Sequence, residues 1–261
     1  MKSDRVAAVV LAAGLSSRMG KNKLLIRLQG ESMVHRAVAR AIAAELDPVV
    51  VVVGHEDQLV RAELAGLSHT EVRNPEYARG MNTSLRTGIA ALPAEAEAAV
   101  VLLADMPFVE VSMLRELVAA FARGTSPLVL SSYGGVVAPP ILYRRALFDE
   151  LRALEGEACG KRVIEAHRAE AAELRWPAAA LLDLDLPEDL ERVRTALEAP
   201  APPSAIDPVC GMTVEVSAAR FRALHDEVEF LFCNPRCREK FLADPGRFLA
   251  LQEQPRWLSR S

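Results

Sequence analysis

Leu11-Ala-Ala-Gly-Leu-Ser-Ser-Arg-Met-Gly-Lys-Asn-Lys23 follows directly on an apolar run that begins at Val6. A short hydrophobic strand therefore ends in a loop of small residues, where backbone N–H groups can turn towards an anion. Arg18 and Lys23 bring two positive charges to this loop, which can neutralise a polyphosphate. The stretch predicts a phosphate-binding turn at the carboxyl end of a buried strand. The alternative is a simple strand–loop–helix turn whose Arg and Lys are solvated.

Composition and charge narrow the class of protein. A chain of 261 residues with a formal net charge of −4 gives no electrostatic reason to expect nucleic acid as a partner. Apolar runs such as residues 98–104 are too short to cross a bilayer, so no membrane partner is expected. The N-terminus mimics a signal peptide, but its apolar segment of about eight residues runs straight into the phosphate loop. We expect a cytoplasmic protein whose four cysteines are reduced or metal-bound.

Residues 1–198 alternate between short β-rich runs and amphipathic helical stretches. Several of the runs are apolar on both faces, as parallel strands covered by helices must be. Such alternation predicts an α/β domain with a mostly parallel, Rossmann-like sheet, helices on both faces and a ligand at the carboxyl edge. The expected strands are residues 6–11, 49–53, 70–73, 100–104, 128–131 and 174–176. The expected helices are a stretch capped by Ser32 and residues 58–67, 84–92 and 113–121.

Four motifs in this region resemble those of the molybdenum cofactor cytidylyltransferases. These enzymes are MobA-like NTP transferases with the nucleotide-diphospho-sugar transferase fold. The loop at 11–23 matches the pattern L-A-A-G-x-S-x-R-M-G-x-x-K, which differs from the P-loop and from Gly-x-Gly-x-x-Gly. The other three are Asn74-Pro-Glu-Tyr-Ala-Arg-Gly80 with the following Ser84, Leu102-Leu-Ala-Asp-Met-Pro107, and Asp183-Leu-Asp-Leu-Pro-Glu-Asp189. The resemblance covers residues 5–197.

The resemblance implies nucleotidyl transfer, in which a substrate phosphate attacks the α-phosphorus of CTP and pyrophosphate leaves. Arg18, Lys23 and Asp105 are the implied catalytic residues. A phosphate monoester has a second pKa near ~6, so the attacking group is mostly a dianion at neutral pH and needs no base. The site must supply positioning and charge neutralisation. The implied nucleotide-binding residues are Leu11, Ala12, Ala13, Gly14, Ser16, Ser17, Gly20, Asn74, Gly80 and Ser84.

The base is inferred from Ala13, because the guanylyl branch of the family carries Gly at that position. A methyl group there favours CTP over the larger purine of GTP. For Mg²⁺ the expected ligands are Asp105 and Asp185, with Asp183 as a less favoured substitute, since Mg²⁺ takes hard oxygen ligands. The alternatives are that Asp105 caps the next helix and that the pair at 183 and 185 belongs to a helix start.

The acceptor region departs from the family pattern. Gly134-Gly-Val-Val-Ala-Pro-Pro140 and Gly156-Glu-Ala-Cys-Gly-Lys-Arg162 stand where cytidylyltransferases have Gly-x-x-Gly-x-Pro and Gly-Asp-x-Gly-Ala-Arg. Lys161 and Arg162 are the candidate acceptor-binding residues, for a phosphorylated pterin-type substrate, or else they form a solvated basic face. Cys159 is interpreted as a packed small residue rather than a reactive thiol.

Three prolines at 200, 202 and 203 indicate a linker over residues 199–206. Beyond it, residues 207–251 resemble a YHS domain, a small α+β module, through Asp207-Pro-Val-Cys-Gly-Met212 and Phe230-Leu-Phe-Cys-Asn-Pro-Arg-Cys237. Cys210, Cys233 and Cys237 are candidate ligands for Zn²⁺ or Cu⁺, with His225, Met212 or Asp207 as the fourth. The alternative is a small aromatic core with buried thiols and no metal.

These features together predict a Mg²⁺-dependent cytidylyltransferase that matures a molybdenum–pterin cofactor for a molybdenum enzyme client. One alternative keeps nucleotidyl transfer with GTP or with another phosphorylated small molecule. A second alternative is a metal-delivery or metalloenzyme-assembly factor whose nucleotide domain acts as a switch.

Overall fold

The computed structural model describes residues 5–15, 20, 22–156, 158–182, 189–198, 204–216, 219–226 and 228–249. By its internal contacts the chain divides into two units, Met1–Glu198 and Ala199–Ser261. Each unit has its own hydrophobic core and is described by itself. No helix among the described residues is both long enough and apolar enough to span a bilayer.

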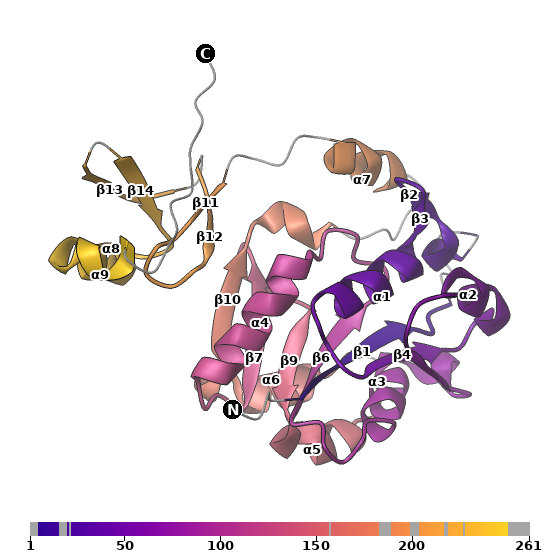
Figure 1. The fold of residues 1–261 in the computed structure, drawn as a ribbon. Helices are drawn as coiled ribbons and strands as arrows, with labels where there is room; N and C mark the ends of the chain where they lie inside the picture. Colours follow the sequence, from indigo (N-terminus) through magenta and orange to yellow (C-terminus); the bar gives the residue numbers. More distant parts are fainter. Residues whose placement is uncertain are drawn as a thin grey trace. The chain divides into compact units, whose positions relative to one another are not determined.

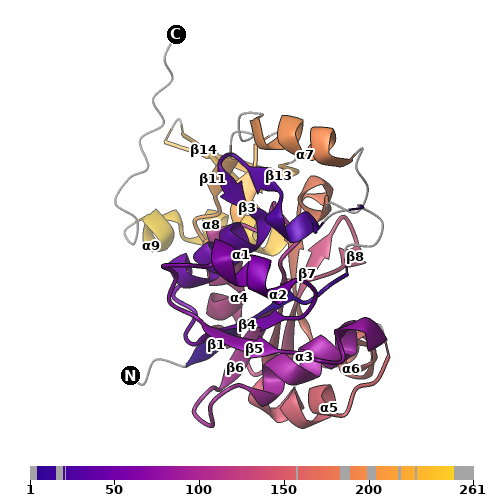
Figure 2. The same cartoon turned by 90° about the vertical axis from the view of Figure 1, so that its right-hand side faces the viewer.

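The large unit is built on a central strand, β1 (Val6–Ala12), every residue of which is buried. β1 pairs in parallel with β4 (Val49–Val53) on one side and with β6 (Ala98–Leu103) on the other. In the described residues the sheet runs in the order β10-β7-β9-β6-β1-β4-β5, with β8 paired to β7. Figure 1 labels the strands from β10 to β4, and Figure 2 labels β5 and β8. The remaining strands are β5 (Thr70–Arg73), β7 (Leu128–Tyr133), β8 (Val136–Val137), β9 (Ile141–Arg144) and β10 (Ala172–Trp176). The predicted α/β class with a mostly parallel sheet is confirmed.

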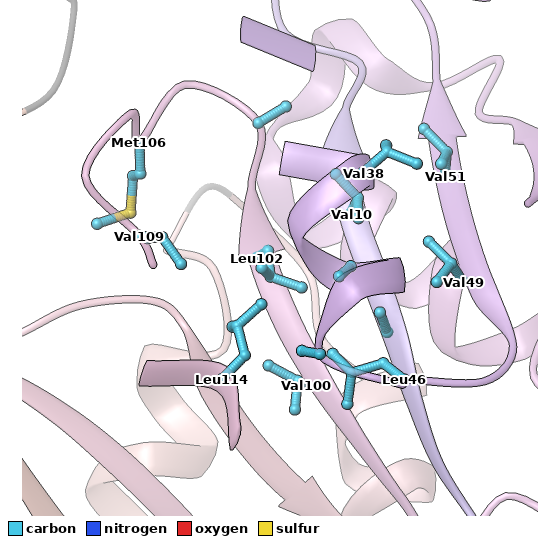
Figure 3. Packing of buried hydrophobic residues seen from close by; sticks show 14 of the residues in the cluster. Val10, Val38, Leu46, Val49, Val51, Val100, Leu102, Met106, Val109 and Leu114 are labelled. Atoms are coloured by element: carbon cyan, nitrogen blue, oxygen red, sulfur yellow. The ribbon is translucent and has the colours of Figure 1, made fainter. Parts of the chain in front are cut away.

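Helices cover both faces of this sheet (Figure 2). The side chains of β1 alternate between these faces and divide the core into two layers. Ala8, Val10 and Ala12 pack with α1 (Met33–Ala43), α2 (Asp57–Glu63) and α4 (Val111–Arg123). Figure 3 shows this layer, where Val10 lies beside Val38 of α1. The odd-numbered residues of β1 pack on the opposite face. The helices there are α3 (Met81–Ala90), α5 (Phe148–Arg152) and α6 (Lys161–Ala166).

β9 was not among the predicted strands. It runs antiparallel to both of its neighbours, because the chain turns back after β7 and inserts the four residues of β9 between β7 and β6. A run of four residues behind Pro139 and Pro140 is too short to show a strand or helix period. The insertion leaves β7 parallel to β6 and places the 134–140 turn at the carboxyl edge of the sheet.

Gly88 lets α3 lie unusually close to the sheet. A Cβ atom at this position would come within 2.3 Å of Val9 Cγ1 and 2.9 Å of Val52 Cγ2. The helix backbone therefore rests directly on β1 and β4. This close contact fixes how near the first turn of α3 lies to the edge of the sheet.

A smaller cluster of the large unit joins its N-terminal hairpin to its last helix. The hairpin consists of β2 (Arg27–Leu28) and β3 (Glu31–Ser32), and Leu28 packs with Val193 of α7 (Asp189–Glu198). Ser32 accepts a hydrogen bond from the backbone N–H of His35 (3.3 Å), as expected of the residue that caps α1.

The small unit contains two antiparallel strand pairs and two helices. β11 (Ser204–Ile206) pairs with β12 (Thr213–Glu215), and β13 (Phe221–His225) pairs with β14 (Val228–Phe232). Phe232 and Phe241 form the centre of its core. The helices are α8 (Pro235–Ala243) and α9 (Pro245–Leu249). Residues 204–206, which composition placed in the linker, form β11, because the proline run stops at 203 and Ser-Ala-Ile can pair as a strand.

Candidate active site

The carboxyl ends of β1 and β6 open into a small cavity of about 170 Å³. It lies where neighbouring parallel strands of an α/β sheet end, which is the usual place for a ligand in this architecture. The lining comes from β1 and the loop after it, from the start of α3 and from the end of β6. The lining residues are Leu11, Ala13, Gly14, Lys23, Leu24, Tyr77, Met81, Ser84, Leu103 and Asp105.

Lys23 and Asp105 meet inside this cavity. The Lys23 Nζ atom lies 2.6 Å from Asp105 Oδ2, and their side chains are only 14% and 22% exposed. The pair forms because Asp105 follows the end of β6 and Lys23 follows the loop after β1, and these strands are adjacent. A hydrogen bond from Ala104 N to Leu11 O (3.2 Å) extends the pairing to the site itself. Glu110 holds the N-cap position of α4, so Asp105 is not a cap of that helix.

Arg40 of α1 fixes the loop that follows Asp105. Its Nη1 donates to the carbonyl oxygens of Pro107 and Val109, both at 2.6 Å, and its Nη2 lies 3.0 Å from Glu110 Oε1. Burial lowers the pKa of Arg40, an effect that the carboxylate of Glu110 opposes. Sequence reasoning missed Arg40, because its partners are main-chain carbonyls some seventy residues away and carry no side-chain signal.

Side chains at the end of β1 alternate between the two faces of the sheet. Only some of the residues predicted to bind nucleotide therefore reach the cavity. Leu11 and Ala13 line it, and Gly14 follows with open space where a Cβ atom would lie. Ala12 points to the opposite face and packs in the α1–α4 layer, so its side chain does not contribute to the lining. Gly20 has a positive φ of 65°, which favours glycine. Arg18, Ser16, Ser17, Asp183 and Asp185 lie outside the described residues.

Asn74, which was predicted to bind the nucleotide, is not among the residues that line the cavity. Its side chain is buried, its Nδ2 donates to Thr83 Oγ1 (2.8 Å) and Ser84 Oγ (2.9 Å), and its Oδ1 accepts from Glu76 N (2.9 Å). Asn74 is therefore a residue that positions the start of α3 rather than one that lines the cavity. Gly80 precedes this helix with φ 118° and ψ 161°, a conformation that only glycine adopts readily, and it too acts by placing Ser84.

Asn82 is a second positioning residue, which the sequence analysis did not identify. Its Nδ2 donates to Glu155 O (2.7 Å), and its Oδ1 accepts from Gly160 N (3.0 Å). These bonds tie the first turn of α3 to the 155–160 loop. Gly160 has a φ of 75°, and a Cβ atom there would lie 2.7 Å from Tyr143 Oη, so the loop packs tightly at that point.

The 155–160 loop leads to a second, larger cavity of about 570 Å³. Its walls are mostly apolar and come from the 137–141 segment and from α6, with Lys161 and Arg168 among the charged lining residues. Lys161 is 71% exposed and lies 3.9 Å from Glu165. Arg162, the other predicted acceptor-binding residue, is exposed and is not part of the lining.

Cys159 lies in the wall of the second cavity. Burial raises the pKa of its thiol to about 12, and the charge of Asp105 adds to this effect. A thiol with so high a pKa remains protonated at neutral pH and is a poor nucleophile. This agrees with its interpretation as a packed residue.

The donor chemistry of the smaller cavity fits a divalent cation. Asp105 supplies a carboxylate that is partly exposed to the cavity, and Ser84 supplies a hydroxyl nearby. Mg²⁺ sites commonly use one or two protein carboxylates and complete their coordination with phosphate and water. The carboxylate of Asp105 is paired with the ammonium group of Lys23, so a cation bound at Asp105 Oδ2 would take the place of that group.

A separate cluster of thiols lies in the small unit. Ligand atoms of Asp207, Cys210, Cys233 and Cys237 all lie within 4.8 Å of one another. The Sγ of Cys233 is 3.4 Å from that of Cys210 and 3.8 Å from that of Cys237. The contact with Cys233 lowers the pKa of Cys210, whereas burial raises the pKa of Cys237 to about 11. Of the proposed fourth ligands, Asp207 belongs to the cluster, and the ring of His225 packs against Phe241 instead.

Two side chains organise the thiols. Asp207 is fully buried and accepts hydrogen bonds from Val209 N through Oδ1 and from Cys233 N through Oδ2, both at 2.9 Å. Asn234 caps α8 and directs its Nδ2 at the sulfurs of Cys233 (3.0 Å) and Cys237 (3.3 Å). Each carboxylate oxygen of Asp207 is thus used by the backbone, and the three sulfurs face one another.

Comparison with known proteins identifies relatives of the large unit. Residues 8–172 match the family model of the MobA-like NTP transferase domain. The chain is 29% identical to the purine catabolism protein PucB of Bacillus subtilis, over 76% of this chain and 100% of that protein. It is 35% identical to the bifunctional protein GlmU of Sorangium cellulosum, over 55% of this chain, and the match spans 32% of that relative's length. Among solved structures, the manganese complex of Rv0371c from Mycobacterium tuberculosis has a TM-score of 0.64 and 25% identity, over 74% of this chain and 99% of that one.

Proposed function

This chain belongs to the MobA-like NTP transferase family and is a nucleotidyltransferase; from this premise we propose that it transfers CMP from CTP to a phosphorylated pterin-type acceptor and releases pyrophosphate. The observation that carries the proposal is the meeting of Lys23 and Asp105, 2.6 Å apart, in a cavity at the carboxyl edge of the sheet. A cationic side chain and a carboxylate in one small cavity are the parts that phosphoryl-transfer chemistry requires, since that chemistry depends on positioning and charge neutralisation.

Each residue has a defined task in this scheme. Lys23, together with Arg18, binds the triphosphate and offsets its charge. Asp105 holds Mg²⁺, with Asp185 as its proposed second ligand, and the bound ion would draw negative charge from the phosphate oxygens. Ser84, held in place by Asn74, presents a hydroxyl to the same cavity. The acceptor phosphate is largely a dianion at neutral pH, so the chain needs no general base.

The choice of CTP rests on Ala13. Its methyl group lies in the cavity lining and close to Gly54, where an added Cβ atom would come within 2.8 Å of both Ala13 and Tyr77. The cavity wall at Ala13 is therefore tightly packed, which supports a pyrimidine rather than the larger purine. GTP is the alternative nucleotide.

The larger cavity is the proposed acceptor site. Its volume of about 570 Å³ lies within the range of small-molecule sites, and its apolar walls suit a flat heterocycle. Lys161, an exposed residue of the lining, is the proposed ligand of the acceptor phosphate, with the exposed Arg162 next to it in sequence. Another phosphorylated small molecule of similar size is the alternative acceptor.

A thermal-shift panel with CTP, GTP, ATP and UTP in the presence of Mg²⁺ tests the nucleotide. We expect CTP to raise the melting temperature most, and stabilisation by GTP alone would reverse the assignment. Pyrophosphate release from CTP with molybdopterin then tests the acceptor. Failure of release with molybdopterin, in a protein that still binds CTP, would leave the nucleotidyltransferase assignment intact and reject the pterin. Nucleotide binding with no transfer to any acceptor would favour the assembly factor.

For the small unit we propose a metal-binding YHS domain that serves a molybdenum enzyme client. The specific observation is the cluster of three facing thiols, two of which receive hydrogen bonds from Asn234. Three of the four clustered ligand atoms are soft sulfurs, and we propose Cu⁺ ahead of Zn²⁺ on that ground. Metal analysis of the full chain after loading with each ion tests this. Equal retention of Cu⁺ in the Cys233→Ser variant would reject the site.

A further inference from the structure

We propose that Lys23 competes with the divalent cation for Asp105, and that binding of the triphosphate relieves this competition. The inference rests on the proposed nucleotidyl transfer and adds a coupling between its two ligands. Without nucleotide, the ammonium group of Lys23 neutralises the carboxylate that would hold the metal. With nucleotide, Lys23 turns to the phosphates and Asp105 becomes available.

The geometry of the pair carries the first half of this proposal. Lys23 Nζ lies 2.6 Å from Asp105 Oδ2, a distance typical of a charge-assisted hydrogen bond. A divalent cation on the same carboxylate would lie next to an ammonium group, and two positive charges this close repel each other. Both side chains are largely shielded from solvent, so water screens this repulsion only in part. Metal binding to the nucleotide-free protein must therefore displace Lys23.

The local backbone explains how Lys23 can move without a wider rearrangement. Lys23 begins the short 3-10 helix Lys23–Leu25, which is fixed by hydrogen bonds from Leu24 N to Asn22 Oδ1 (3.1 Å) and from Ile26 N to Lys23 O (3.1 Å). The side chain of Lys23, whose four-carbon stem is flexible, can therefore turn while these backbone bonds stay in place. Gly14 lines the same cavity, and among the described residues no atom lies within 4 Å of the position that its Cβ would take.

The consequence is a positive coupling between metal and nucleotide. Coupling is reciprocal, so a nucleotide that frees Asp105 for the metal must itself bind more tightly when the metal is present. Couplings of this kind commonly amount to about 5-fold to 150-fold in affinity. The nucleotide-free enzyme would consequently bind little divalent cation and would load metal and triphosphate together.

The test measures Mn²⁺ affinity of the full chain without nucleotide, by the electron paramagnetic resonance signal of free Mn²⁺. Lys23→Met and Lys23→Gln remove the competing charge, and we expect each to bind Mn²⁺ about tenfold more tightly than the natural chain. Arg27→Met is the matched control, because it removes one positive charge from the same unit where Arg27 pairs with Glu63 instead of Asp105. This control should retain the affinity of the natural chain, and thermal melting checks that every variant is folded.

If both folded Lys23 variants bind Mn²⁺ no more tightly than the natural chain, the proposal that Lys23 competes with the metal is overturned. The same tenfold gain in Arg27→Met would also overturn it, since the effect would then reflect net charge alone. Asp105→Asn separates this failure from failure of the proposed function. Loss of Mn²⁺ binding in Asp105→Asn supports Asp105 as the metal ligand whatever the Lys23 variants do. Unchanged binding in Asp105→Asn would reject the metal site on which both proposals rest.

Discussion

At the scale of single residues, the candidate site depends on which face of a strand a side chain occupies. Ala12 and Ala13 are chemically identical neighbours, yet Ala12 packs under α1 and α4 while Ala13 lines the cavity. Leu11 and Ala13 share a face because side chains of a strand alternate. Asp105 follows the end of β6, which runs parallel to β1. It therefore lies at the same edge of the sheet as the loop that follows β1.

The carboxylate of Asp105 is expected to matter for transfer far more than for folding. Asp105→Asn should lower kcat/KM about 10²-fold to 10³-fold, by analogy with the loss of one preorganised charge-stabilising group. Pyrophosphate release measures the rate, and thermal melting should show only a small change in stability. Asp149→Asn is the matched control, since Asp149 is 93% exposed and pairs with Arg152 at the surface. Equal losses in the two variants would contradict the role of Asp105.

Cys159 provides a prediction about reactivity and pH. Burial raises the pKa of this thiol to about 12, so its thiolate fraction at pH 8 is about 10³-fold below that of a thiol with the ordinary value of 9.0. We expect iodoacetamide to modify Cys159 at least 10²-fold more slowly in the folded chain than in urea, with the gap narrowing as the pH rises towards 11. Peptide mass spectrometry resolves this site from the other cysteines. Rapid modification at pH 8 would contradict the raised pKa of this thiol.

At the scale of secondary-structure elements, the sequence predicted the strands that have clear patterns and missed those that depend on distant partners. Val49–Val53 and Thr70–Arg73 have the predicted bounds, because a run of β-branched residues or a strand flanked by turn residues is a local signal. β9 was not predicted, because four residues are too few to show a hydrophobic period, and its pairing with β6 and β7 is what makes it a strand. β11 was not predicted for the same reason.

The residues of the candidate site divide in the same way. Some are marked by a local motif, and the role of others depends on partners far along the chain. Lys23 and Asp105 could be identified because motifs mark charged residues that directly follow strands. The role of Asn74 could not, because its bonds to Thr83 and Ser84 depend on how α3 returns to the sheet. Arg40 and Asn82 were missed because their hydrogen bonds reach carbonyls or amides far along the chain.

The packing of α3 against the sheet yields a stability prediction. Gly88→Ala places a methyl group 2.3 Å from Val9 Cγ1, in a core where β-branched side chains have little freedom to move. We expect a loss of about 2 kcal/mol in the free energy of unfolding, even though Ala favours helices over Gly. Urea denaturation measures the loss.

Gly124→Ala is the control for this variant. Gly124 follows α4, and the nearest atom to an added Cβ would be 3.4 Å away, which is an ordinary contact. This substitution should change the free energy of unfolding by less than about 0.5 kcal/mol. A Gly88→Ala protein as stable as the Gly124→Ala protein would mean that α3 does not press on the sheet.

At the scale of the whole molecule, the two units have separate cores and should respond separately to metal. If the three thiols of the small unit hold an ion, a thiol-competent chelator should lower the melting temperature of that unit by several degrees, because a bound metal stabilises the folded state by mass action. The transition of the large unit should not move. Differential scanning calorimetry of the full chain measures both.

The matched control for that experiment is a triple Cys210→Ser, Cys233→Ser, Cys237→Ser chain. The chelator should have no effect on it, while the transition of the large unit stays where it is in the natural chain. A chelator effect of the same size in the triple variant would show that the stabilising ion is bound elsewhere.

The reversed direction of β9 has an evolutionary consequence. In the described part of the sheet, β7, β8 and β10 form a flank that is joined to β6 through this antiparallel strand, and residues 137–141 supply walls of the larger cavity. Substitutions at the partly exposed positions of this segment can therefore reshape the larger cavity while β1, β4 and β6 keep their register. Variation of the larger cavity would then be separable from the Lys23–Asp105 pair, which lies on the other side of β9.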